Sequence, residues 1–178
     1  FYLDNIQLLG KMKAPVIDDL VEDFDGGSVL PKGVSGTAET DSVSLSTEFY
    51  ATGSAVKIEA KGNSSSHVTG IIVRKNKGAF TADGITFWMK GPDTNTWGAV
   101  AMHATYPDGT EKWFKTNGQY GNPAYIMNQG DGSAFNISVN YSDLHEVDNW
   151  ITGIPNYTPS PTEEDIACFD AVGIGIYM

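Results

Sequence analysis

The sequence predicts an all-β fold, a β-sandwich of the jelly-roll type in which short strands form two packed sheets. Strand-length runs of alternating apolar and polar residues recur along the whole chain, and no long segment spaces its apolar residues as a helix does. The runs are separated by turn-forming residues, among them many of the 20 glycines. A length of 178 residues lies within the range that such all-β domains reach undivided.

Eight strands are expected from these runs. They lie at residues 1–9, 54–60, 67–74, 85–90, 97–106, 110–116, 134–141 and 171–178. Residues 26–46 are rich in Gly, Ser and Thr and are expected to form an extended loop with at most a short strand. Pro107-Asp108-Gly109 predicts a hairpin turn, because Pro presets its φ and Gly accepts a positive φ.

Charge and cysteine content exclude several classes of protein. The formal net charge of −11 disfavours a protein that follows nucleic-acid phosphates or binds anionic lipid surfaces. No apolar run is long enough to be a transmembrane helix. Cys168 is the single cysteine, so the chain can form neither an internal disulfide nor a cysteine-rich zinc site, and its apolar neighbours predict a buried structural thiol.

Alternation within the strands predicts which side chains face outward. In residues 85–90 the apolar set is Ile85, Phe87 and Met89, which leaves Trp88 on the opposite face. The same alternation in three further strands turns outward Trp97, His103, Trp113 and Tyr177. The alternative is that these tryptophans belong to the core, because aromatic residues favour strands for packing reasons alone.

Small residues share the outward face with these aromatics. Ala99, Ala101, Gly173 and Gly175 would form a flat floor. Trp150 lies in a long Pro-containing connection, residues 149–164, and loops of that length are usually functional. A flat floor with aromatic walls suits a chain-shaped sugar, because an aromatic ring covers the apolar C–H face of a pyranose.

Four segments resemble carbohydrate-binding modules of family 11, which bind β-1,4- and mixed-linkage glucans. EDFDG at residues 22–26 resembles the family's opening strand "DDFEG", and NISVNYSDL at 136–144 is similar to its "TIEIPFSSF" strand. IACFDAVGIGIY at 166–177 resembles the penultimate strand, and FYLDNIQL at 1–8 resembles the final strand "FVVDNIKL".

The resemblance implies roles for particular residues. Tyr177 matches a sugar-stacking Tyr, and the segment with His145, Asn149 and Trp150 matches one that supplies binding residues, although it lacks the family's Arg-rich run. His67 falls near another family aromatic. A structural Ca²⁺ is also implied, and its candidate ligands are Asp4, Asp23 and Asp25. The alternative is that these acids are solvated at a strand edge.

The order of the motifs differs from that of the family, because the final strand comes first. Residues 1–10 are therefore either the tail of an upstream module or a strand permuted into this fold, 11–16 a linker, and 17–178 the sandwich. A third account is that the family's final strand follows Met178, in residues that this sequence does not contain. In each case the first strand is expected to pair beside residues 171–178, because the first and last strands of such sandwiches lie close together.

The expected function is a non-catalytic carbohydrate-binding module that takes a β-1,4-glucan, mixed-linkage glucan or xyloglucan and targets an attached glycoside hydrolase. The expected setting is a secreted bacterial system that degrades plant cell walls, with no nucleic-acid or membrane partner. The predicted ligand contacts are Trp88, Trp97, His103, Trp113, Trp150 and Tyr177.

Two alternatives remain. One is a β-sandwich glycoside hydrolase or lyase, although no strand carries the alternating acids that supply two catalytic carboxylates. Glu163-Glu164-Asp165, which follows Pro161, is expected to be a solvated charge run or a turn starter in a loop. The other alternative is a protein-interaction sandwich of the cell-surface kind.

Overall fold

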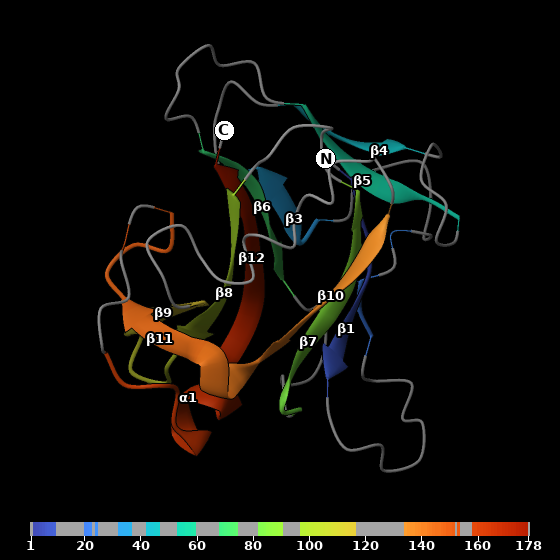
Figure 1. The fold of residues 1–178 in the computed structure, drawn as a ribbon. Helices are drawn as coiled ribbons and strands as arrows, with labels where there is room; N and C mark the ends of the chain where they lie inside the picture. The colour runs from blue at the N-terminus through green and yellow to red at the C-terminus, as the bar shows by residue number, and fades with distance from the viewer. Residues whose placement is uncertain are drawn as a thin grey trace.

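The chain folds as a β-sandwich of two antiparallel sheets (Figure 1). The computed structural model describes residues 2–9, 20–22, 24, 32–36, 42–46, 53–59, 68–74, 82–90, 97–116, 134–151, 153 and 158–177. Within these residues each sheet has six strands, and the predicted all-β sandwich is confirmed. None of the helices among these residues is long and apolar enough to cross a membrane.

The first sheet combines strands from both ends of the chain. Its order is β10 (Phe135–Asn140), β7 (Gly84–Lys90), β1 (Tyr2–Leu9), β5 (Ala55–Glu59) and β4 (Ser42–Ser46). The short strand β2 (Leu20–Glu22) also pairs with β1.

The second sheet contains the last strand at an interior position. Its order is β11 (Leu144–Val147), β9 (Glu111–Thr116), β8 (Trp97–Thr105), β12 (Phe169–Tyr177), β6 (Val68–Arg74) and β3 (Val34–Gly36). A short 3₁₀ helix (Tyr141–Asp143) and the helix α1 (Glu163–Ala167) lie in the connections.

All eight predicted strands form, with ends within two residues of those expected. The expectation for residues 26–46 was incomplete, because β3 and β4 both lie there. Strand β4 alternates serines with two aliphatic residues, and Val43 pairs with Ile58 of β5. Strand β11 was also missed. A segment this short and polar becomes a strand through its neighbour, which sequence periodicity does not reveal.

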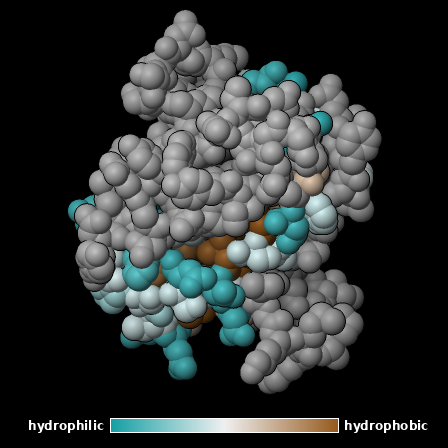
Figure 2. All heavy atoms as spheres, in the orientation of Figure 1, coloured by the Kyte–Doolittle hydropathy of each residue, from teal (hydrophilic) through white to brown (hydrophobic). Residues whose placement is uncertain are grey.

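The core lies between the two sheets and follows the predicted alternation. Ile85, Phe87 and Met89 of β7 are fully buried against Val172 and Ile174 of β12 and the other core side chains. In Figure 2 the apolar atoms of the described residues are visible as a narrow band flanked by hydrophilic residues. The alternation predicted for these strands is therefore confirmed.

The first strand is a central element of its sheet. Strand β1 pairs with β7 on one side and with β5 and β2 on the other. Leu3 and Ile6 are both fully buried although they are three residues apart, because the register with β7 shifts between Asp4 and Gln7. The predicted pairing of this strand with the last strand is wrong, since β8 and β6 occupy both edges of β12.

The segment that resembles a family opening strand is extended only in part. Strand β2 ends at Glu22, and Phe24 has a φ of 63°, in the left-handed region. A bulky residue adopts this conformation only when its surroundings favour it, and the Phe24 side chain is fully buried in the core. Burial of the ring therefore offsets the strain of the backbone at this position.

The hairpin and the α1 helix are tied to each other. The turn forms as predicted: Gly109 has a φ of 86°, and Asp108 accepts the backbone N–H of Thr110 at 2.9 Å. The hydroxyl of Tyr106 donates to Asp165, which also forms a capping box with Thr162. Burial and the Asp165 hydrogen bond raise the pKa of Tyr106.

Of the three acidic residues at 163–165, all predicted to be solvated, only two are exposed to solvent. Glu163 and Glu164 are exposed, but Asp165 is buried. Burial by itself would raise the pKa of Asp165, but the hydrogen bonds from Tyr106 and Thr162 outweigh it and lower the pKa. The three residues lie in a helix because a Thr followed three residues later by an acid starts one. Cys168, just after this helix, is half-buried and packs against the core.

We expect the first strand to be essential for stability. Replacing Ile6 with Ala should lower the free energy of unfolding by about 2–5 kcal/mol, because it leaves a cavity in the core. Deleting residues 1–9 should cause aggregation, because it opens edges on β7 and β5. Urea unfolding and size-exclusion chromatography measure both effects, with exposed Ser44→Ala as the matched control. A deletion variant that stays monomeric with an unchanged melting temperature would contradict this role.

Candidate functional site

The outer face of the second sheet gathers most of the predicted ligand contacts. Trp97 on β8 and Tyr177 on β12 are Cα partners at one end of this face. Their side chains lie outside the described structure. Between this pair and the other end of the strands, five positions on this face carry small residues, and we call them the small-residue floor: Gly70, Ala99, Ala101, Gly173 and Gly175. All five are buried, and the larger Ile72 and Lys115 are the Cα partners of Gly173 and Ala101 on the same face.

Three of the predicted side chains form one aromatic cluster at the other end. The ring centroids of His103 and Trp113 are 4.6 Å apart, and those of Trp113 and Trp150 are 5.4 Å apart with an interplanar angle of 28°. His103 and Trp150 are only 2% and 4% exposed, whereas Trp113 is half-buried. Trp150 forms a second, smaller hydrophobic core with Ala101 and Val147, and Trp113 packs against this core.

Trp150 lies flat on the floor at Gly173. A Cβ added to Gly173 would be 3.1–3.2 Å from three carbons of the indole ring. Glycine at this position therefore lets a planar ring contact the backbone of the sheet directly. The structure places Trp150 against this face as a covered side chain that supports Trp113, and its role as a ligand contact stays a prediction.

The turn that carries Trp150 is fixed to β9 by a buried lysine. Asn149 accepts the backbone N–H of Ile151 at 2.8 Å, and the backbone N–H of Gly153 donates to the carbonyl of Asn149 at 2.6 Å. Lys115, which is 1% exposed, donates from Nζ to the carbonyl of Gly153 at 2.8 Å. Burial lowers the pKa of Lys115 to about 8.

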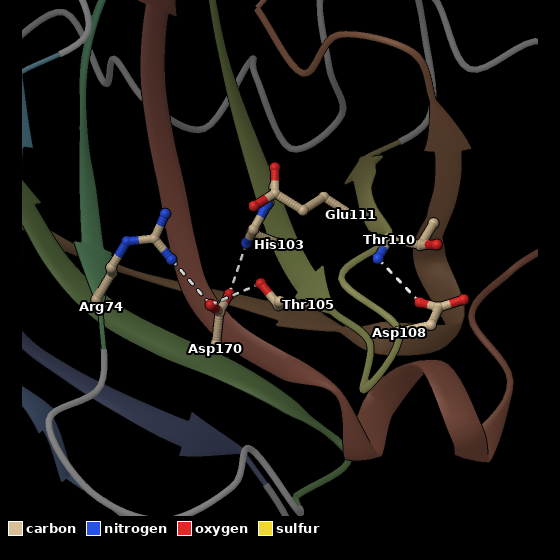
Figure 3. A network of polar contacts seen from close by, with 7 residues as sticks. All are labelled: Arg74, His103, Thr105, Asp108, Thr110, Glu111 and Asp170. Carbon is tan, nitrogen blue, oxygen red and sulfur yellow. Dashed lines mark hydrogen bonds and ion pairs between the residues drawn. The ribbon is translucent and has the colours of Figure 1, made fainter.

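A polar network next to the cluster is centred on Asp170 (Figure 3). Asp170 accepts from Arg74 Nη1 at 2.8 Å and from the Thr105 hydroxyl at 3.0 Å, and its Oδ1 is 2.6 Å from His103 Nδ1. Glu111 lies on the other side of the same imidazole, 3.7 Å from Nε2. The register of β12 shifts between Phe169 and Ala171, and this bulge directs Asp170 to the outer face while Phe169 stays in the core.

The geometry of this network holds the imidazole in place. Asp170 fixes one ring nitrogen of His103, and Trp113 packs against the ring. Among the residues that the structure describes, the Nε2 side of His103 contacts the carboxylate of Glu111 and no hydroxyl or thiol nucleophile. Within the described residues the imidazole of His103 therefore lies between two carboxylates and against the Trp113 ring.

Trp88 is the predicted contact that lies apart from the others. It is on β7 in the first sheet, with its side chain on the outer face and 37% exposed. The two sheets of a sandwich turn their outer faces in opposite directions. Trp88 and the second-sheet aromatics therefore cannot contact the same stretch of ligand.

The side chains of the predicted calcium ligands lie outside what the structure describes. Asp4 is on β1, where its Cα partner is Trp88, and its side chain is not described. Asp23 and Asp25 lie outside the described residues, as does His67. No group of three or more His, Cys, Asp or Glu side chains within the described ranges could hold a metal ion. The calcium site stays a prediction.

Sequence reasoning missed the polar residues that position the face. Asp170 carries a visible signal, because it is an acid inside the otherwise apolar run at 166–174, where a charge requires partners. Lys115 and Arg74 show no such signal, since a cation in an alternating strand is ordinarily solvated. His145, which the resemblance pointed to, is half-buried with Nδ1 2.6 Å from the Thr158 carbonyl.

No protein-family model matches the chain, and no curated protein matches it either. The resemblance to family 11 therefore depends on the short segments described above, and the function has to be argued from the geometry.

The contact between Gly173 and Trp150 can be tested with a double-mutant cycle. Gly173→Ala should lower the free energy of unfolding by about 1–3 kcal/mol, because the new methyl group meets the indole ring. Tryptophan fluorescence should shift to the red as Trp150 moves into water. In a Trp150→Ala background, Gly173→Ala should lower the free energy of unfolding by a smaller amount. Equal losses with and without the indole would show that the ring does not lie on this glycine.

Stability should also depend on pH through Lys115. Its pKa is lower in the folded chain, so between about pH 8 and 10 the unfolded chain binds more protons, and the free energy of unfolding rises with pH. The slope is at most about 1.4 kcal/mol per pH unit. Lys115→Met should flatten this slope, as measured by urea unfolding between about pH 8 and 9, where most tyrosine side chains, with an ordinary pKa of about 10, are still protonated. Parallel slopes in both proteins would contradict the assignment.

Proposed function

We propose that this domain is a non-catalytic module that holds a neutral β-glucan-type polysaccharide on the outer face of the second sheet. One observation carries the proposal. The cluster of His103, Trp113 and Trp150 lies on this face, and Trp97 and Tyr177 are Cα partners on β8 and β12 beyond the small-residue floor. Aromatic side chains grouped on a flat sheet face are suited to the C–H faces of pyranose rings.

Within this face Trp113 is the central contact. His103 and Trp150 pack against it and are themselves almost fully buried, so the plane of the Trp113 ring is set before any ligand binds. A preoriented ring loses less conformational freedom on binding, which favours affinity. Trp97 and Tyr177 would supply the second contact, because Trp97 lies six residues along β8 from His103, the Cα partner of Trp113, or about 20 Å. That separation accommodates more than one pyranose ring.

The charges near the face favour a neutral ligand. Arg74 pairs with Asp170, and His103 lies between Asp170 and Glu111. The Arg74 guanidinium is thus already paired with an acid, whereas an acidic polysaccharide would need such a cation for its carboxylates. A β-1,4- or mixed-linkage glucan or a xyloglucan fits this balance.

The setting of the module is proposed from the family resemblance. A module of this kind would be secreted by a bacterium that degrades plant cell walls, and it would target a covalently attached glycoside hydrolase to its substrate. The catalytic alternative has less support, because the Asp170 carboxylate already accepts from Arg74 and Thr105 and contacts His103. A protein-interaction sandwich has no specific observation in its favour.

The test is affinity electrophoresis through gels that contain mixed-linkage β-glucan, xyloglucan or mannan. The domain should be retarded by a glucan, and Trp113→Ala should weaken binding about 5- to 100-fold, as loss of a stacking aromatic does. Glu163→Ala on α1, exposed and outside this face, is the matched control. Circular dichroism confirms that each variant is folded.

A reducing-sugar assay on the same polysaccharides separates the alternatives. Retardation without sugar release supports the module. Release of sugar would establish a hydrolase. If the domain is not retarded and no sugar is released, the protein-interaction domain is the remaining alternative.

A further inference from the structure

The outer face of the first sheet carries an aromatic side chain of its own. Trp88 is the one large hydrophobic residue that is exposed in the described part of the chain. A single exposed indole is ordinary on a protein surface, so the surroundings of the ring decide whether it has a role.

On the β10 side the residues beside Trp88 are uncharged and polar, and on the β1 side its Cα partner is Asp4, whose side chain is not described. Asn136 of β10 is the Cα partner of Trp88 on the other side, and Thr86 and Ser138 form the next partner pair on the same face. Asn136 and Ser138 are exposed, and Thr86 is half-buried. We call Trp88, Thr86, Asn136 and Ser138 the Trp88 patch.

Hydrogen bonds within the patch fix the orientation of the amide. The Thr86 hydroxyl is 2.8 Å from Asn136 Oδ1 and 2.9 Å from the Ile137 carbonyl, and the Ser138 hydroxyl is 3.1 Å from Thr86 Oγ1 and 3.3 Å from Asn136 Oδ1. The Asn136 amide donates one N–H to the Phe87 carbonyl at 3.2 Å. Its second N–H has no acceptor among the described residues, so the patch offers an oriented donor beside an aromatic ring.

This combination matches the chemistry of a neutral sugar. A pyranose has one apolar C–H face, which an indole covers, and an edge of hydroxyls, which an amide and two hydroxyls can pair with. A protein partner would need a wider apolar centre than one ring among polar neighbours. A phosphate-bearing partner would be repelled by the net charge of −11.

We propose that the Trp88 patch is a second, separate site for a neutral β-glucan chain, so that the domain is bivalent. The patch lies on the sheet opposite the face around Trp113, and the two outer faces point away from each other. One domain therefore joins two polysaccharide chains, or two stretches of one chain. The inference shares its ligand class with the proposed function but uses none of the same residues.

Isothermal titration with cellohexaose tests the second site in four proteins: the wild type, Trp88→Ala, Trp113→Ala and the double variant. The wild type should bind two ligands per chain and each single variant one. The binding that remains in Trp113→Ala should fall about tenfold or more when Trp88 is also replaced. Trp88→Tyr should keep most of the affinity, because it keeps an aromatic face. Ser44→Ala, exposed on β4 of the same sheet, is the matched control.

Asn136→Asp tests the oriented amide donor in the Trp113→Ala background. The carboxylate keeps the acceptor for Thr86 and Ser138 but has no N–H to give, so affinity should fall about fivefold or more.

The outcomes for the two sites are distinguishable. If Trp88→Ala binds with the stoichiometry and affinity of the wild type while Trp113→Ala loses all binding, the second site is overturned and the proposed function stands. If Trp113→Ala has no effect and Trp88→Ala abolishes binding, the patch is a glucan site and the proposed location on the second sheet is wrong. A change of oligomeric mass in Trp88→Ala with unchanged glucan binding would show that the patch contacts another copy of the chain, which also overturns the proposal.

Discussion

The alternation of strand β12 is the constraint on which the second sheet depends. Its two edges are fully used by β8 and β6, so its register cannot shift without turning every side chain to the wrong face. Val172 and Ile174 fill the core, while Gly173 and Gly175 give the opposite face no side chain. The same strand therefore holds the two sheets together and creates the flat surface on which Trp150 lies.

Two bulges, one in β1 and one in β12, interrupt the regular alternation of inward and outward side chains. The register shift in β1 allows Leu3 and Ile6 to be buried together, which a regular strand would not permit. The shift in β12 keeps Phe169 in the core and moves the Asp170 carboxylate outward, where it meets Arg74 and His103. In each strand a single register shift keeps apolar side chains in the core. In β12 the same shift also forms the polar network that supports the aromatic cluster.

Burial divides the aromatic residues of the sandwich into different roles. His103 and Trp150 are covered and determine how Trp113 is held, and Lys115 fixes the turn from which Trp150 projects. Beside Trp88, the side chains of Thr86, Asn136 and Ser138 hydrogen-bond to one another. The second sheet thus presents a rigid aromatic surface, and the first sheet presents a smaller and more polar one.

The sequence by itself determined the eight main strands, the hairpin turn at Gly109 and the inward face of β7, β8 and β12, because period-two alternation and turn chemistry are local properties. It also identified Trp88 as outward-facing. Only the tertiary structure decided that Trp88 lies on the other sheet from Trp113, that β1 pairs with β7 and β5 instead of β12, and that Trp150 is covered. Alternation states which way a side chain points within its strand, but the choice of partner strands is made by contacts between residues far apart in the chain, which no local pattern encodes.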